Sequence, residues 1–219
     1  MPLTFLFLSF QRSMCIALLI YASFYPQNLR ASTLQNIPRA LMLNDGGYYQ
    51  GELAFARFSK FSAKGDVLWS RPFGLVYARP LAGDKGTVYV GSSNGCVYAV
   101  KPNGTVLWQT KTRGPVLSDL QWGSDRSSLF VATDNGWLYA LSGRDGKALW
   151  TLPLGFETGA TLEGALQFSS GQNTLYLRDS HNKLYAVRVP KTASTLNVKT
   201  LNQNESNAPQ LVWVRSLGE

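Results

Sequence analysis

Cysteine and histidine are scarce in this sequence, and its charged residues are not clustered. Two cysteines, Cys15 and Cys96, and one histidine, His181, occur among 219 residues, of which 16% are charged. Cys15 falls in an apolar N-terminal segment, so the mature chain would keep one cysteine and could form no internal disulfide. A disulfide-stabilised miniprotein is excluded, and packing must stabilise the fold.

No cationic cluster accompanies the net charge of +8, which arises from 21 Lys and Arg against 13 Asp and Glu. Arg12 and Arg30 lie in the N-terminal segment, and Lys111 with Arg113 is the nearest approach to a basic patch. Nucleic-acid-binding surfaces gather their Lys and Arg on one face. We therefore predict no nucleic-acid partner.

The sequence also lacks an apolar run of about 20 residues, the length that a membrane-spanning helix requires. Two shorter runs, 1–10 and 14–25, flank Arg12. A cationic residue before about 7–15 apolar residues is typical of a secretory signal. We expect residues 1–31 to be a signal peptide, which predicts a secreted, periplasmic or secretory-lumen protein. The alternatives are an uncleaved anchor, which would give the only membrane contact, or a start at Met14. Cys15 lacks the small neighbours of a lipobox.

The composition predicts an all-β fold. Hydrophobic residues make up 45% of the chain and aromatic residues 12%, alongside 20 Gly and 10 Pro. That apolar content suffices for a packed core. Branched and aromatic residues favour strands, whereas Gly and Pro mark the turns between them.

A repeated unit organises the chain. Residues 86–100 (GTVYVGSSNGCVYAV) recur 41 positions later as 127–141, and 46 positions after that as 173–187. Each copy alternates apolar and polar residues around a polar turn, which predicts a hairpin. In two copies the turn contains Asn-Gly, which suggests a type I′ turn with positive φ at both residues.

A second turn and a strand ending in Trp follow each hairpin, and a further apolar segment precedes it. Each unit of about 41 residues therefore predicts four strands, which is one propeller blade. The first unit is degenerate, and a polar insertion at 191–208 stretches the last. The predicted blades within residues 32–217 are about 41–70, 71–110, 111–151 and 152–215.

The repeat resembles the PQQ-like, or quinoprotein-dehydrogenase-like, β-propeller family. Ala140–Trp150 matches its eleven-residue docking motif, with Gly146 at the seventh place, and Ala99–Trp108 is one residue shorter. The resemblance implies that each repeat Trp packs between its blade and the next. The implied docking residues are Trp69, Trp108, Trp150 and Trp213, with Gly104 and Gly146 in the turns. Trp122 and Trp137 lie off this column, and Trp137 is expected to be solvent-facing or inter-blade.

Four blades predict an incomplete ring, because relatives of this repeat type close with six to eight. Such an arc leaves two blade faces uncovered. We interpret the chain first as a fragment or shortened gene product. Self-association of two arcs is the second interpretation, and a degenerate four-bladed ring is the third.

No catalytic, cofactor-binding or metal-binding residue is predicted. Quinone-dependent members of the family hold their cofactor against a vicinal disulfide beside Ca²⁺, and this chain has no adjacent cysteines. Glu157 and Glu163 have no diagnostic spacing, Cys96 is expected to be partly exposed, and His181 occupies a hairpin turn. The aspartates lie singly in predicted turns, at Asp84, Asp125, Asp134, Asp145 and Asp179.

These observations favour a non-catalytic, exported scaffold that binds a protein through loops at the blade edges and uses no cofactor. Relatives without cofactor residues, among them barrel-assembly lipoproteins and luminal stress-sensor domains, act by interaction. One alternative is a fragment of a quinone-dependent dehydrogenase, and another is a luminal sensor-type propeller. In a eukaryotic host, Asn103 and Asn204 would be glycosylation acceptors.

Overall fold

The structure of this chain is a computed structural model that describes residues 39–171, 173–190 and 208–217. All of them belong to the second of two compact units, Pro38–Glu219. The predicted signal peptide, Asn204 and nearly all of the predicted insertion lie outside the described residues. Besides strands, the described part contains two short 3-10 helices, Leu53–Phe55 and Asp84–Gly86.

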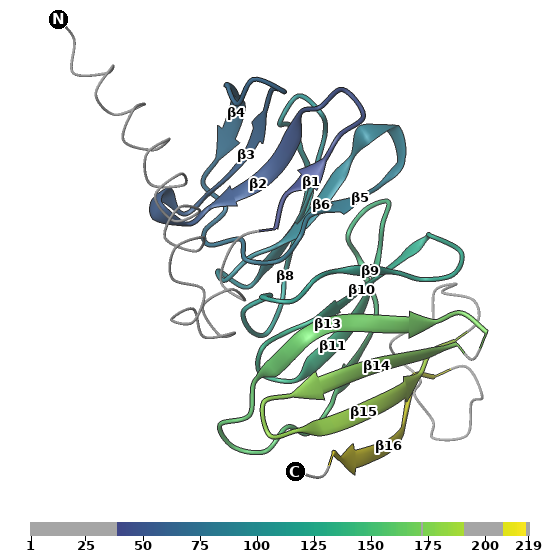
Figure 1. The fold of residues 1–219 in the computed structure, drawn as a ribbon. Coiled ribbons are helices and arrows are strands. Elements are labelled where there is room, and N and C mark those ends of the chain that lie inside the picture. Colours follow the sequence, from purple (N-terminus) through teal and green to yellow (C-terminus); the bar gives the residue numbers. More distant parts are fainter. Residues whose placement is uncertain (1–38, 172, 191–207, 218–219) are drawn as a thin grey trace, which may run out of the picture. The chain divides into compact units, whose positions relative to one another are not determined.

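Sixteen described strands form four antiparallel four-stranded sheets, which confirms the all-β, four-blade prediction. Within each sheet the strands follow chain order (Figure 1). The first sheet comprises β1 (Leu41–Met42), β2 (Tyr48–Glu52), β3 (Arg57–Phe61) and β4 (Val67–Arg71). The second comprises β5 (Leu81–Ala82), β6 (Val88–Gly91), β7 (Cys96–Val100) and β8 (Val106–Lys111).

The third and fourth sheets repeat this plan. The third comprises β9 (Gln121–Trp122), β10 (Ser128–Ala132), β11 (Trp137–Ser142) and β12 (Ala148–Pro153). The fourth comprises β13 (Leu162–Ser169), β14 (Thr174–Asp179), β15 (Lys183–Arg188) and β16 (Gln210–Ser216).

The central hairpin of each sheet turns where the repeat predicts, but its geometry differs from the prediction. Gly95 has φ +74° and Gly136 φ +79°, whereas Asn94 and Asn135 are not among the residues with positive φ. The turns are therefore not type I′, and only the last turn residue is left-handed, as in three-residue hairpin loops. Asn182, with φ +60°, takes the glycine position in the fourth sheet.

The third and fourth strands of every sheet share a register shift in the same column. Just before the shift, the repeat tryptophan of the second, third and fourth sheets pairs with alanine: Ala99 opposes Trp108, Ala140 opposes Trp150, and Ala186 opposes Trp213. A β-bulge bends its strand and re-aims the neighbouring side chain. In the first sheet Lys60 opposes Trp69 in place of alanine, which agrees with the degenerate sequence of that unit.

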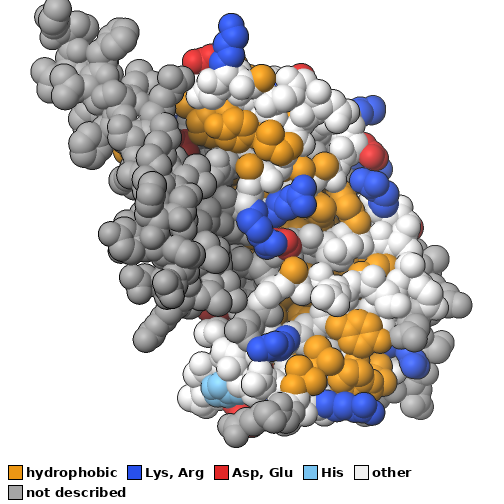
Figure 2. Space-filling view, viewed as in Figure 1, with side chains coloured by type: hydrophobic (Ala, Val, Ile, Leu, Met, Phe, Trp, Pro, Cys, Tyr) orange, Lys and Arg blue, Asp and Glu red, His pale blue; other side chains and the backbone are white. Residues whose placement is uncertain are grey.

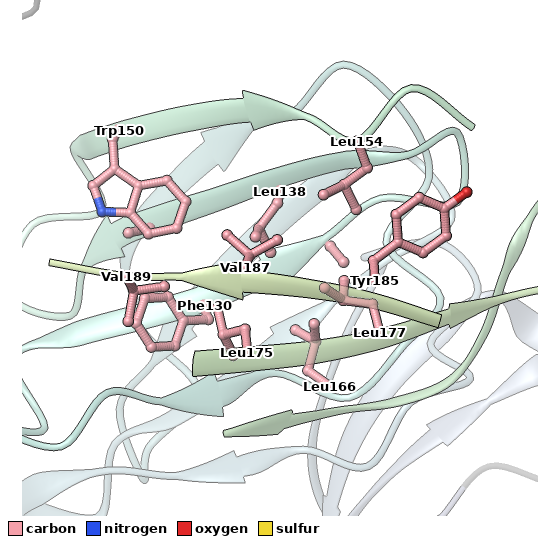
Figure 3. Packing of buried hydrophobic residues seen from close by; sticks show 12 residues of the cluster. Phe130, Leu138, Trp150, Leu154, Leu166, Leu175, Leu177, Tyr185, Val187 and Val189 are labelled. Carbon is pink, nitrogen blue, oxygen red and sulfur yellow. The ribbon is translucent and has the colours of Figure 1, made fainter. Parts of the chain in front are cut away.

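The hydrophobic core of the described residues lies in three clusters, each between consecutive sheets. Phe58 of the first sheet packs with Tyr98 of the second. Figure 3 shows the cluster between the third and fourth sheets, with Leu138 and Val187 between Trp150 and Tyr185. Every residue of β6 and β7 is buried, so both faces of these strands are covered. This explains why their sequences are nearly continuous apolar runs, without the polar face of a half-buried strand.

Candidate functional site

The first two repeat tryptophans each hold the turn between the third and fourth strands of the next sheet. The indole Nε1 of Trp69 donates to the Pro102 carbonyl at 2.8 Å. Two residues further along β4, Arg71 Nε donates to the Gly104 carbonyl, also at 2.8 Å. We call such a tryptophan, together with the residue two positions later, a clamp. Its two donors satisfy two carbonyls of one turn.

Trp108 and Thr110 form the second clamp. The indole Nε1 of Trp108 donates to the Gly143 carbonyl at 3.2 Å, and Thr110 Oγ1 donates to the Gly146 carbonyl at 2.6 Å. Gly146 has φ +72°, and a Cβ there would lie 2.5 Å from the indole. Turn conformation and close approach of the ring therefore both require glycine at this position.

Gly104 meets the same two requirements, because its φ is +82° and a Cβ would lie 2.9 Å from Trp69. Trp150 is 7% exposed, and its ring centroid lies 5.8 Å from that of Phe130. Residues 191–207, in the connection between β15 and β16, lie outside the described residues. Trp213 is half-buried, with the Arg215 guanidinium 4.9 Å from its ring centroid. Asn103 is exposed beside Gly104.

Trp122 is a contact that the sequence analysis missed. Its Nε1 donates to the Ala82 carbonyl of the second sheet at 2.9 Å, and its ring lies edge-on to Tyr89 with 5.0 Å between centroids. A Cβ at Gly143 would lie 2.8 Å from the same ring. Trp122 thus joins the second and third sheets from the first strand of a blade, where the repeat pattern places no tryptophan.

A second candidate site, which we call the hairpin surface, is formed by the central hairpin turns of the second, third and fourth sheets and by the segments that link consecutive sheets. The turns are residues 92–96, 133–137 and 179–183, and the linking segments are 72–80, 112–120 and 154–161. In each case a backbone N–H in the turn donates to a carbonyl of the segment that follows the preceding sheet. These bonds join Ser93 to Leu75 at 2.9 Å, Asp134 to Pro115 at 2.8 Å, and Ser180 to Thr161 at 2.9 Å. The turns are thereby fixed to their neighbours.

Side chains reinforce this backbone pattern. Asn94 Nδ2 donates to the Phe73 carbonyl at 2.8 Å and to the Tyr98 hydroxyl at 2.7 Å. One sheet later, Asn135 Nδ2 donates to the Arg113 carbonyl at 3.1 Å, while the Arg113 N–H donates to the Tyr139 hydroxyl at 2.9 Å. The backbone of Arg113 is therefore fixed from two sides.

In the fourth sheet a buried carboxylate replaces the hydroxyl residue of the earlier hairpins. Asp179 is fully buried and accepts hydrogen bonds from the backbone N–H groups of His181 and Lys183, each at 2.9 Å. The Tyr185 hydroxyl donates to Asp179 Oδ2 at 2.8 Å. Burial, and after it this hydrogen bond, raises the pKa of the Tyr185 phenol. Asp179 is thus a structural acceptor for its own turn.

The exposed chemistry of the hairpin surface is cationic and aromatic. Arg113 is exposed, and its guanidinium carbon lies 4.0 Å from the ring centroid of half-buried Trp137, within the range of a cation–π contact. Lys183 pairs with exposed Glu157 and, followed by His181, lowers the pKa of that carboxyl. Trp, Tyr and Arg are the side chains enriched at the energetic centres of protein interfaces. The hairpin surface therefore combines a cation–π pair with an exposed ion pair.

The described acids do not fit a calcium-supported quinone site. Asp125 accepts hydrogen bonds from the backbone N–H and hydroxyl of Ser127, at 3.0 Å and 2.5 Å. Burial tends to raise the pKa of Asp125, but the bonds from Ser127 and Ser128 outweigh it and lower that pKa. Asp145 accepts the Lys147 N–H at 3.2 Å. These oxygens serve their own turns, whereas Ca²⁺ needs 6–8 converging oxygens.

Cys96 is buried, with 4% of its surface exposed, so the expectation of a partly exposed thiol is wrong. Its sulfur accepts a hydrogen bond from Gln109 Nε2 at 3.1 Å and packs in the cluster between the first two sheets.

The described residues have neither a metal-binding cluster nor a membrane-spanning helix. They contain no group of three or more His, Cys, Asp or Glu side chains that could hold a metal ion. In that part of the chain, no helix has the length and apolar character that a membrane crossing requires.

Comparison with known proteins agrees with this architecture. A family profile described as outer membrane protein assembly factor BamB matches residues 55–212. No curated protein sequence matches the chain. Among solved structures, BamB from Moraxella catarrhalis is similar at a TM-score of 0.58 with 16% identity, over 84% of this chain and 49% of that one. The chain thus spans about half the length of that structure, and the likeness establishes the fold alone.

Replacing Gly146 by Ala should destabilise the protein more than the same change at Gly159. Both glycines have positive φ, +72° and +83°, which costs an alanine about 1–2 kcal/mol. A Cβ at Gly146 would also collide with the Trp108 ring, which adds about 1–3 kcal/mol of overpacking, whereas nothing lies within 4 Å at Gly159. Urea unfolding of both variants measures the difference. Equal losses of stability would show that the clamp contact is unimportant.

Proposed function

Because this chain belongs to the BamB family of PQQ-like β-propeller proteins, we propose that it is a non-catalytic, exported scaffold that binds a protein partner. The family profile covers residues 55–212, well over half of the chain. Its description as an outer membrane protein assembly factor supports a role in assembling a protein complex. The proposed location is therefore outside the cytoplasm, in a periplasm or an equivalent compartment.

The observation that carries the proposal is the Arg113–Trp137 pair on the hairpin surface. Arg113 follows β8 of the second sheet and Trp137 begins β11 of the third, yet the guanidinium lies 4.0 Å from the indole centroid. Lys111 donates to the Asn94 carbonyl beside this pair. A side-chain cluster held rigid before binding loses little conformational entropy when a partner docks. The cations favour a partner that presents carboxylates around an apolar contact.

Photo-crosslinking tests the proposed surface. A photoreactive phenylalanine analogue at Trp137 should form a covalent adduct with one partner protein in the native host. The same probe at Leu107, a 46% exposed residue of β8 outside the hairpin surface, should not form that adduct. Once the partner is identified, Arg113→Ala should weaken its binding about 30-fold, as expected for loss of about 2 kcal/mol at an interface centre. Equal adducts at both positions, or unchanged affinity, would reject this surface.

Absence of quinone-dependent catalysis is part of the same proposal, supported by the use of Asp125, Asp145 and Asp179 as acceptors within their own turns. The purified chain incubated with the quinone, Ca²⁺ and a panel of alcohols and sugars as electron donors should reduce no redox dye and bind no quinone. An authentic quinoprotein dehydrogenase in the same assay shows that the reagents work. Dye reduction that depends on both the quinone and Ca²⁺ would instead favour the dehydrogenase-fragment alternative.

Export is proposed from the apolar N-terminal segment alone, since residues 1–31 lie outside the described residues. N-terminal sequencing of the chain recovered from the extracytoplasmic fraction should show cleavage before the first strand, β1. A chain found intact in the cytoplasm would contradict export. An intact chain in the membrane fraction would replace the signal peptide by an anchor.

A further inference from the structure

We propose that the clamp on β16, Trp213 with Arg215, docks the β3–β4 turn around Gly65 of a second copy of this chain. The proposal goes beyond the proposed function, because it uses neither the hairpin surface nor the protein partner of that surface. It rests on the clamp of β16 and on the Gly65 turn, which are the two sides of one kind of contact and lie in different sheets.

The clamp on β16 repeats the clamp on β4. Trp213 and Arg215 have the residue types and spacing of Trp69 and Arg71, whose donors hold the Pro102 and Gly104 carbonyls. Trp213 also occupies the same register position, because it pairs with Ala186 as Trp108 pairs with Ala99. Arg215 therefore corresponds to the clamp arginine that is engaged one sheet after β4.

No described glycine turn lies against Trp213. The glycines of the second and third sheets approach Trp69 and Trp108, and none within the described ranges approaches Trp213. Instead, the Arg215 guanidinium lies 4.9 Å from the Trp213 centroid, and Arg215 is exposed. Figure 2 shows hydrophobic side chains gathered over the sheet that contains β14 and β15, with Lys and Arg around them. Arg215 of the clamp is thus exposed and Trp213 is half-buried on a sheet whose visible surface is of mixed apolar and cationic character.

The turn around Gly65 is the matching half. Ser62 N–H donates to the Asp66 carbonyl at 2.8 Å and Gly65 N–H to the Ser62 carbonyl at 2.9 Å. The docked turn has the same two bonds, Lys101 to Thr105 at 2.8 Å and Gly104 to Lys101 at 2.9 Å. The φ of Gly65 is +86° and that of Gly104 is +82°, so the two turns share one backbone conformation.

The two turns differ in what covers them. Gly104 and Gly146 are buried under the indoles of the preceding sheet, whereas Gly65 is exposed and an added Cβ would meet nothing within 4 Å. The exposed carbonyls of this turn can therefore accept the two clamp donors. Asp66 adds a carboxylate directly beside Gly65, which complements the charge of Arg215.

A second copy of the chain supplies both halves at once. In a two-fold pair, the clamp of each copy holds the Gly65 turn of the other, so one kind of contact forms twice and the contact is closed. This contact would have the form of the one between the first and second sheets, with the equivalent carbonyls of the Gly65 turn as acceptors. That identity of turn geometry, together with Asp66, is why we assign a second copy as the occupant.

Light scattering and sedimentation of the full chain over a range of concentrations test the proposal. The mass should rise to that of two chains. Arg215→Glu should weaken this association at least about tenfold, the effect of losing a hydrogen bond from a charged donor. The double variant Asp66→Arg with Arg215→Glu should recover part of the lost affinity, because the ion pair re-forms with its charges exchanged between copies, although glutamate cannot donate to the turn carbonyl. Arg113→Ala, on the hairpin surface, should leave the mass unchanged, which separates this proposal from the proposed function.

Gly65→Ala has a matched control in Gly159→Ala. Both glycines have positive φ, +86° and +83°, and both have open space at the Cβ position, so the backbone strain is similar. Only the Gly65 variant should lose pairing, because its Cβ would meet the partner's Trp213. Thermal unfolding confirms that each variant is folded. A mass of one chain at all concentrations, or a pair that survives both Arg215→Glu and Gly65→Ala, would overturn the proposal.

Discussion

The contact between an indole and a glycine turn of the next sheet is the constraint on which this structure depends. An isolated four-stranded sheet of this size leaves both faces exposed, and repeat architectures become stable only when neighbouring units bury a shared core. The clamps of Trp69 and Trp108 bring consecutive sheets to ring-contact distance and satisfy the turn carbonyls. Hydrophobic clusters then fill the space between the sheets. Shape complementarity at the glycine and directional hydrogen bonds thus fix the packing in which apolar burial occurs.

The same packing positions the hairpin surface. Arg113 follows the last strand of the second sheet and Trp137 begins a strand of the third, so their contact exists only because the two sheets are held in register. Inter-sheet backbone bonds, such as Asp134 to Pro115, then restrict the turn that precedes Trp137. A binding surface made from two rigid units is preorganised in a way that a single flexible loop is not. Stability and recognition therefore rest on one set of inter-sheet contacts.

The sequence predicted the features that repeat and missed those that occur once. Recurring Trp, Ala and Gly columns indicated four-stranded units. The Asn-Gly turns predict positive φ at both residues, but in the second sheet only the glycine has it. Asn94 keeps a negative φ, and its side chain donates hydrogen bonds to the Phe73 carbonyl and the Tyr98 hydroxyl. Trp122 and the Arg113–Trp137 pair break the repeat, so no column revealed them. The second clamp residue was also missed, because Arg71 and Thr110 differ in type and share only a donor aimed at a carbonyl.

The choice of arginine at that second position has a physical consequence for the last sheet. Thr110 has a short side chain. Its Oγ1 reaches the Gly146 carbonyl at 2.6 Å because that turn already lies against β8. Arg215 is long enough to lie over the indole of its own clamp, where cation–π attraction and the apolar stem partly shield the ring from water. Docking exchanges that internal contact for hydrogen bonds to a turn, so the net gain per clamp is smaller than the bonds alone would give. We therefore expect the association at β16 to be weaker than two new hydrogen bonds alone would make it.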